Sequence, residues 1–175
     1  GKGAKVELMY SPFEAVEKAE RHPDITWVVA AVGFETTAPS YALMMQQAVE
    51  KGIRNIRLVT ALKTVIPALR WICENQMDID GFICPGHVSV IIGSKPYEAL
   101  AREYKKPFVI AGFEAEHILA VIYDLVRQIE KKEAKVKNLY TNAVHTAGNQ
   151  KALDVLKTYF EPGPAMWRGL GDRKS

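Results

Sequence analysis

The sequence has 175 residues, of which 48% are hydrophobic and 25% charged, a mixture typical of one globular domain with a substantial core and not of a disordered chain. The formal net charge is only +3, and the lysines and arginines are scattered among acidic residues, which argues against nucleic-acid binding. No apolar run approaches the ~18–20 residues of a membrane span, and the first residues contain no hydrophobic signal region, so we expect a cytoplasmic protein.

The predicted elements alternate between strands and helices. In chain order they are a strand at 6–10, a helix from 11 to about 22, a strand at 26–34, a helix at 39–50, a strand at 55–62, a helix at 66–76, a strand at 81–84, a helix at 96–104, a strand at 107–112, a helix at 114–132 and a helix at 150–160. Residues 136–140 fit a strand or a loop. The alternation predicts an α/β fold with a mostly parallel sheet of about five strands and helices on both faces, in a Rossmann-like three-layer arrangement.

Local signals support several of these elements. Ser11, Pro12 and Glu14 form a capping box, with serine at the N-cap, proline at the first helical position and glutamate at the third. The strand at 26–34 is continuously apolar, as expected of a strand that is covered on both faces. The helix at 114–132 is amphipathic, and one of its faces carries Ile118, Ile122, Leu125 and Ile129. We expect residues 1–166 to form a single α/β domain of a longer protein, with 167–175 as its truncated tail.

Three polar, glycine-containing loops follow strands of the predicted sheet. In open α/β sheets the carboxyl ends of the strands carry the ligand site, so we expect these loops to meet at one edge and line one depression. The candidate site residues are Gly33, Phe34, Glu35, Thr36, Thr37, Pro85, Gly86, His87, Val88, Ser89, Gly112 and Glu114.

The side chains of these loops allow more than one interpretation. Thr36 and Thr37 precede a helix that begins near Pro39, where free N–H groups suit an anionic ligand, although Thr37 could equally serve as the helix cap. His87 could bind a metal or relay protons, or it could be an ordinary surface histidine. Glu35 and Glu114 could form a carboxylate pair across neighbouring loops.

The other histidines and the two cysteines carry less information. We expect His22 and His117 to be surface residues, and His145 lies in the ambiguous segment. Cys73 and Cys84 are the only cysteines; Cys73 is predicted to lie in the core, and burial is the default for Cys84. The sequence has no CxxC pair, so this chain alone lacks a self-contained iron–sulfur or zinc site.

Five motifs, taken together in order and spacing, resemble a known family. They are GFETTAP (33–39), CPGHVSVIIG (84–93), PFVIAGFE (107–114), GN (148–149) and WRGLG (167–171). The combination spans nearly the whole chain and is similar to the HypD family of hydrogenase maturation proteins.

The resemblance implies a scaffold that carries iron with cyanide and carbonyl ligands, Fe(CN)2CO, together with the partner HypC, and that receives cyanide from HypE. It also implies a [4Fe–4S] cluster in the full-length family, whose cysteine motifs are not present in these 175 residues, so no cluster is expected here. By this resemblance His87 would face the iron, Ser89 would orient His87 or donate a hydrogen bond, and Thr36 and Thr37 would contact the cyanide-bearing group or a partner. The chain departs from the family where Asn142 stands at a position expected to hold arginine.

Two other classes of function fit the residues alone. One is an enzyme acting at the sheet edge on a small phosphorylated or carboxylated ligand, with Glu35 or His87 as the acid–base group. The other is a module that only binds a small anionic ligand. A dinucleotide is disfavoured because no GxGxxG follows any predicted strand. Whether the chain is an enzyme is left open by its residues, and the resemblance favours a metallocentre-assembly scaffold over a self-sufficient catalyst.

Overall fold

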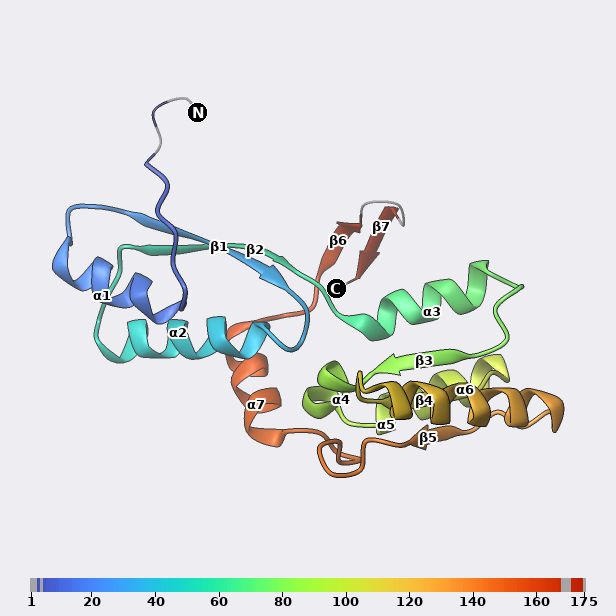
Figure 1. Ribbon diagram of the computed structural model, residues 1–175. Helices are drawn as coiled ribbons and strands as arrows, with labels where there is room; N and C mark the ends of the chain where they lie inside the picture. The colour runs from blue at the N-terminus through green and yellow to red at the C-terminus, as the bar shows by residue number, and fades with distance from the viewer. Residues whose placement is uncertain (1–2, 4, 168–170, 175) are drawn as a thin grey trace.

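The computed structural model describes residues 3, 5–167 and 171–174, and alternates strands and helices as the sequence predicts (Figure 1). The elements are α1 (Phe13–Arg21), β1 (Trp27–Gly33), α2 (Ala38–Glu50), β2 (Ile56–Leu62), α3 (Val65–Asn75), β3 (Phe82–Pro85), α4 (Gly86–Ile92), α5 (Lys95–Tyr104), β4 (Phe108–Ala111), α6 (Ala115–Glu130), β5 (Val136–Asn138), α7 (Gln150–Tyr159), β6 (Pro164–Trp167) and β7 (Gly171–Lys174).

Five parallel strands form two sheets rather than one. The first sheet pairs β1 with β2, and the second has the order β3-β4-β5. In Figure 1, β1 and β2 run toward the middle of the molecule from one side and β3 from the other, so that the carboxyl ends of both sheets face the middle. The predicted α/β class, with its parallel strands and Rossmann-like layering, is confirmed.

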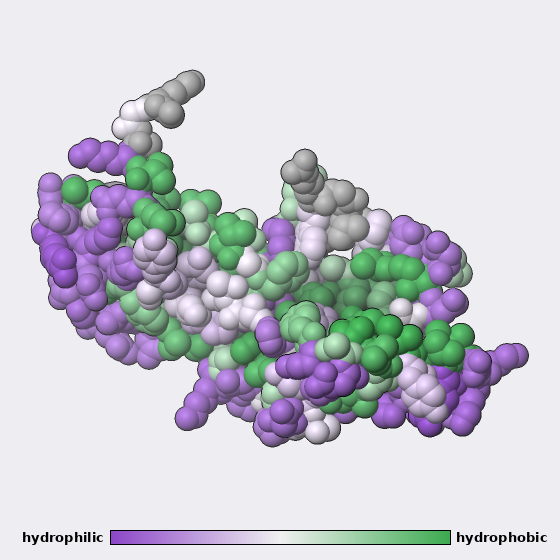
Figure 2. Space-filling view, viewed as in Figure 1, coloured by the Kyte–Doolittle hydropathy of each residue, from purple (hydrophilic) through white to green (hydrophobic). Residues whose placement is uncertain are grey.

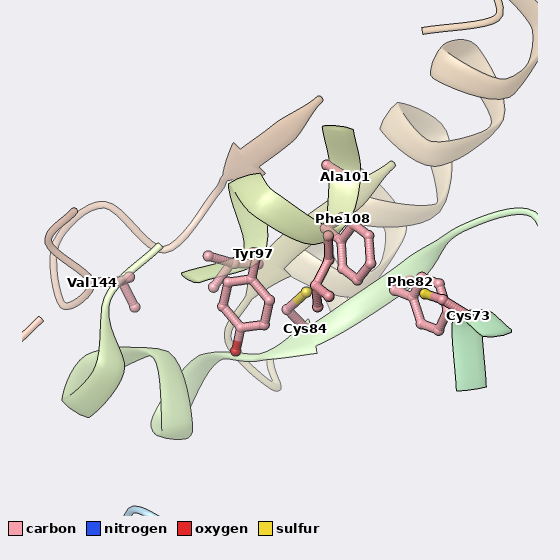
Figure 3. Packing of buried hydrophobic residues seen from close by; sticks show 9 residues of the cluster. Cys73, Phe82, Cys84, Tyr97, Ala101, Phe108 and Val144 are labelled. Carbon is pink, nitrogen blue, oxygen red and sulfur yellow. The ribbon is translucent and has the colours of Figure 1, made fainter. Parts of the chain in front are cut away.

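The second sheet has helices on both faces. Phe108 and Ile110 of β4 point into a core that α3 and α5 complete with Cys73, Tyr97 and Leu100 (Figure 3). The alternate β4 residues point the other way and pack against α6. This alternation follows from the two-residue period of a strand, and it explains why all four residues of β4 are buried.

Within the part of the chain that the structure describes, the first sheet is covered on one face only. The helices α1 and α2 pack together on that face, around Val16, Val29 and Met44. Val28, Val32 and Val59 point to the opposite face, and each is more than half exposed. In Figure 2 green residues lie along this side of the molecule. The sequence prediction that 26–34 is covered on both faces is therefore wrong for the described residues, because α1 and α2 return to the same side.

The strand predicted at 6–10 does not form. Val6, Leu8 and Tyr10 are 91%, 76% and 92% exposed, and the segment pairs with no strand of the described residues. The capping box that follows is present in part, since the Glu14 carboxylate accepts hydrogen bonds from the Tyr10 and Ser11 N–H groups at 3.0 Å.

One further segment differs from the prediction. The PGHVS segment, expected to be a loop, begins the seven-residue helix α4 immediately after β3. The tail at 167–175 contains β7, which pairs antiparallel with β6 at the end of the preceding segment. The WRGLG motif falls partly on 168–170, which lie outside the described residues, as does Ser175. None of the described helices is long and apolar enough to cross a membrane.

Within the described residues, the chain crosses between the two halves of the molecule twice before the β6–β7 hairpin, whose β7 then contacts α3. It leaves the first sheet between β2 and α3, and it returns through α7, which packs against both α2 and α4. Before α7, the loop at 145–149 lies tightly on the end of α4. Gly93 and Gly148 both have positive φ, of 80° and 72°, and their backbones are in direct contact.

Asp124 is a buried carboxylate that holds β5 against α6. Its side chain is 3% exposed, and Oδ1 accepts hydrogen bonds from Lys137 Nζ at 2.7 Å and Arg127 Nη2 at 3.1 Å. Oδ2 accepts from Gln128 Nε2 at 2.8 Å, and the Gln128 amide oxygen in turn accepts from the Lys135 N–H. Burial alone would raise the pKa of Asp124, but Lys137, Gln128 and Arg127 outweigh it and hold the pKa below the ordinary value.

Replacing Asp124 with asparagine is expected to lower the free energy of unfolding by about 1–3 kcal/mol at pH 7, because Lys137 loses its buried partner. The folded pKa of Asp124 is depressed, so its contribution is complete well above the ordinary value of 3.8 and is lost as the pH falls through the folded pKa. Urea denaturation should therefore show a gap between wild type and Asp124→Asn that closes below about pH 4.

Glu133→Gln provides the matched control for this prediction. Glu133 Oε2 pairs with Lys135 Nζ at 3.0 Å on the surface of the same region, and an exposed pair of this kind contributes little to the free energy of unfolding. A gap of the same size for Glu133→Gln, or one that does not depend on pH for Asp124→Asn, would contradict the structural role of the Asp124 network.

Candidate functional site

The carboxyl ends of β3, β4 and β5 bring together five polar and aromatic side chains. His87 lies one residue into α4, Phe113 and Glu114 follow β4, His117 lies in the first turn of α6, and Tyr140 follows β5. The ring of His87 meets that of Phe113 edge to face, with centroids 4.9 Å apart. His117 Nδ1 lies 2.9 Å from Glu114 Oε2, and its ring centroid is 5.9 Å from that of Tyr140. We call these five residues the His87 cluster.

Two glycines allow the His87 cluster to form. A Cβ on Gly112 would lie less than 3.0 Å from Glu114 Oε2 and His117 Nδ1, so the Glu114–His117 pair rests directly on the Gly112 backbone. A Cβ on Gly86 would come equally close to the Ala111 carbonyl oxygen and to the Tyr140 ring. At Gly86 the clash is with backbone, so close approach requires glycine there; at Gly112 a Cβ would instead displace the ends of the Glu114 and His117 side chains and so disturb their pair.

Glu114 is the negative centre of this cluster. Its own N–H group lowers the pKa of the carboxyl most, burial opposes this, and the nearby His117 and His87 lower the pKa further. The carboxylate is thus held in its charged form at neutral pH. His87 is exposed and faces solvent beside this charge, so its imidazole can accept or donate a hydrogen bond to a bound group.

The rest of the PGHVS segment is structural. Ser89 is fully buried, and its hydroxyl donates to the Pro85 carbonyl oxygen at 2.9 Å and lies 3.0 Å from the Tyr97 hydroxyl. Val88 is buried as well. Within the described residues no hydrogen bond joins Ser89 to His87, so the serine fixes the start of α4 rather than the imidazole. Burial raises the pKa of Tyr97, which keeps its hydroxyl protonated.

The GFETT residues lie at the carboxyl end of the first sheet, not the second. Gly33 has a φ of +144°, and a Cβ there would collide with the Thr37 side chain. Thr37 occupies the N-cap position of α2 but makes no capping hydrogen bond with its side chain, and Thr36 is exposed. Phe34 packs edge to face on Trp167, with ring centroids 5.7 Å apart.

Glu35 is the buried member of this second group. It is 6% exposed, and its Oε1 accepts a hydrogen bond from the Val65 N–H at 2.8 Å. Val65 is the first residue of α3, so a carboxylate from the first sheet caps a helix that covers the second. Burial raises the pKa of Glu35, against the opposing effect of the Val65 N–H.

The predicted site residues therefore fall into two groups on two sheets. The three loops were expected to meet at the edge of one sheet, and they lie on two sheets instead. The carboxyl ends of both sheets nevertheless face the middle of the molecule (Figure 1). The groups are electrostatically linked, because the charge of Glu35 contributes to raising the pKa of Tyr97, the partner of Ser89. The sequence suggested that Glu35 and Glu114 form a carboxylate pair. In the structure the two carboxyl groups are separate: Glu35 is buried, and Glu114 lies at the surface.

Sequence reasoning missed His117, Phe113 and Tyr140 as members of the site. His117 was expected to be a surface residue, but its spacing of three from Glu114 on a helix already places the two side chains together. Tyr140 follows a segment that could not be assigned to a strand, so its position at the same edge had no signal in the sequence.

The described residues do not offer a donor set for an iron–sulfur cluster. Cys73 and Cys84 are free thiols buried in the core of the second sheet, and burial raises the pKa of both. Among the residues that the structure describes, no three His, Cys, Asp or Glu side chains are grouped so as to hold a metal ion. Iron at His87 would therefore need ligands from outside the chain described here.

Comparison with known proteins gives a consistent match. The family model "HypD: Hydrogenase formation hypA family" matches residues 1–175. The chain is 40% identical to the hydrogenase maturation factor HypD of Rhodobacter capsulatus and 41% identical to that of Azotobacter vinelandii, over 97% of this chain and 46% of each relative. It is 39% identical to the HypD of Cupriavidus necator, over 97% of this chain and 47% of the relative. The chain spans about half the length of these curated relatives.

Proposed function

The chain belongs to the HypD family of hydrogenase maturation factors, and from this premise we propose that it acts as a scaffold on which the Fe(CN)2CO group of [NiFe] hydrogenases is assembled, with HypC and HypE as partners in the cytoplasm. The observation that carries the proposal is the family match over residues 1–175, which includes the GFETT and PGHVS motifs of the two site groups.

The chemistry of the His87 cluster supports this role. A cyanide bound to iron presents a nitrogen lone pair, which accepts hydrogen bonds. His87 can donate to it from an exposed imidazole, and the Thr36 hydroxyl is exposed at the end of the other sheet. In the proposal the iron is cargo: His87 contributes one contact or one ligand, and the remaining ligands come from the cyanide and carbonyl groups and from a partner. The [4Fe–4S] cluster is not assigned to any of the described residues.

The surface around this edge suits a partner protein. Phe113 is 67% exposed beside His87, and the α6 residues Leu119 and Tyr123 are also strongly exposed. In Figure 2 a large green area lies over this half of the molecule, between α3 and α6. Exposed aromatic and apolar side chains next to a polar site are typical of protein-binding surfaces.

A complementation experiment tests the proposal. In a strain that lacks its own maturation factor, the gene for this protein should restore [NiFe]-hydrogenase activity, and affinity purification should recover HypC and HypE homologues. The purified assembly should show the infrared bands of iron-bound cyanide and carbonyl. Normal protein levels without hydrogenase activity, or assembly without those bands, would contradict the scaffold role and favour a separate ligand-binding or enzymatic function.

A further inference from the structure

A hydrogen bond joins the two sheets of the molecule directly. We call residues 5–62, which contain β1 and β2, the first-sheet unit, and residues 65–149, which contain β3, β4 and β5, the second-sheet unit. Most hydrogen bonds and ion pairs between described residues stay within one unit, but the Val65 N–H donates to Glu35 Oε1 at 2.8 Å and so crosses between them. The helix α7 and the β6–β7 hairpin, which also contact both units, lie outside these two ranges.

This bond lies where the chain leaves the first sheet. Just before it, the Lys63 N–H donates to the Gly33 carbonyl oxygen at 2.8 Å. Val65 is the first residue of α3, which packs into the core of the second sheet. Thr64, with an extended backbone, is therefore the single residue between two anchored neighbours. Both anchors come from the end of β1 and the residues just after it, so the connection between the two units turns at this point.

Glu35 provides α3 with a cap that its own segment lacks. The Thr64 side chain makes no capping hydrogen bond, and Pro67 at the third helical position has no N–H group. A carboxylate at a helix N-terminus is favourable because it accepts from a free N–H group at the positive end of the helix dipole. Glu35 is 6% exposed, so little bulk water competes for the bond. The start of α3 is thus held by a side chain of the other unit.

We propose that Glu35 is a positioning residue, whose bond to the Val65 N–H sets the angle between the two units and thereby the gap between Thr36 and the His87 cluster. Thr36 follows Glu35 directly in the chain, so one loop carries both the bond and one side of the gap. The other side lies at the carboxyl end of the sheet that α3 covers. Without the bond, the backbone at Thr64 and Val65 is free to turn, and the angle becomes variable.

Single-molecule FRET on the full chain tests this proposal. The dyes are attached at Val49→Cys on α2 and Ala99→Cys on α5, two exposed positions on helices of different units. Cys73 and Cys84 are buried and should react only slowly with the dyes. In Glu35→Leu, which fills a similar space without an acceptor, the mean distance between the dyes should change by at least about 2 Å, the size of a domain rearrangement.

Two further variants separate the hydrogen bond from the packing of the side chain. Glu35→Gln keeps an oxygen that can accept from the Val65 N–H, so it should retain the wild-type distance. Val65→Pro removes the donor instead, and α3 should still form because proline is favoured at the first helical position after an extended residue such as Thr64. It should give the same change as Glu35→Leu, and the double variant should add nothing further.

Asp124→Asn is the matched control. Asp124 is also a buried carboxylate, but its partners lie at 127–137, within the second-sheet unit. Its replacement should lower stability and leave the distance between the dyes unchanged, which a purely structural role of Glu35 would do as well.

The proposal is overturned if Glu35→Leu or Val65→Pro folds and retains the wild-type distance, if Glu35→Gln changes the distance as much as Glu35→Leu, or if Asp124→Asn does. Where one of the first two variants fails to fold, the other decides. Only the use of the gap by a bound group rests on the proposed function. The FRET measurement requires no hydrogenase, so its failure and that of the complementation experiment can be told apart.

Discussion

Replacing His87 with alanine is expected to lower hydrogenase maturation by at least about tenfold, the factor that corresponds to a loss of ~1.4 kcal/mol of stabilisation of the bound cargo. The substitution removes an exposed imidazole that lies beside the Glu114 carboxylate and against Phe113. Because the side chain is exposed, its loss should change the free energy of unfolding by less than about 1 kcal/mol. Hydrogenase activity in the complemented strain, together with the cyanide and carbonyl infrared bands of the purified assembly, measures the effect.

His145→Ala is the matched control for this result. His145 is also an exposed histidine, but it lies in the 145–149 loop at the far end of α4 and makes no ring contact among the described residues. The His145→Ala variant should support normal hydrogenase maturation. If His87→Ala retains full maturation and both infrared bands at normal protein levels, His87 serves only to start α4, and the assignment of the site fails.

Replacing Gly148 with alanine is expected to destabilise the fold by about 3 kcal/mol or more. Gly148 has a φ of +72°, and a Cβ there would lie less than 3.0 Å from the Ile91 carbonyl oxygen and the Gly93 nitrogen. These are backbone atoms at the end of α4, so they cannot turn aside as a side chain could. The same loop donates a hydrogen bond from the Asn149 N–H to the Ile91 carbonyl at 2.9 Å, which the shift would break. Urea denaturation would measure the loss of stability.

Gly52→Ala separates the two causes of this loss. Gly52 has a similar φ of +68°, but nothing lies within 4 Å of the place where its Cβ would be. Its replacement therefore carries only the penalty of the left-handed conformation, about 1 kcal/mol. Equal losses for the two variants would show that the contact between the 145–149 loop and α4 is not as close as described, since conformational strain alone would then account for both.

The elements that sequence reasoning predicted correctly are those whose signals are local. The strand–helix alternation, the amphipathic α6 and the end of the helix predicted at 39–50 depend on periodicity and turn residues within each segment, and their bounds agree with the structure to within a few residues. The segment at 6–10 failed because alternating apolar residues form a strand only when a neighbouring strand accepts their hydrogen bonds. The division into two sheets likewise depends on which strands pair over long distances in the sequence, and local patterns do not predict this pairing.

The site was predictable in its residues but not in its grouping. The rule that ligand sites lie at the carboxyl ends of parallel strands placed His87, Gly112 and Glu114 at one sheet edge, where the structure has them, because it requires only the order of the elements. It could not separate the GFETT group from the PGHVS group, since both follow strands of a sheet assumed to be continuous. It also could not show that Ser89 is buried while His87, two residues away, is exposed; this follows from the start of α4, which turns the two side chains in different directions.

The two crossings of the chain between the halves of the molecule limit how the halves can move. Both crossings line one cavity of about 330 Å³ at the carboxyl end of the first sheet, one through Lys63 and Thr64 and the other through Leu156 and Phe160. Two tethers permit rotation about the line that joins them and oppose translation, so this cavity lies close to any hinge axis. The elements farthest from that line, α1 in one half and α6 in the other, would then sweep the widest arcs. A pair of spin labels on α1 and α6 is accordingly where opening or closing of the molecule would register as the largest change in distance.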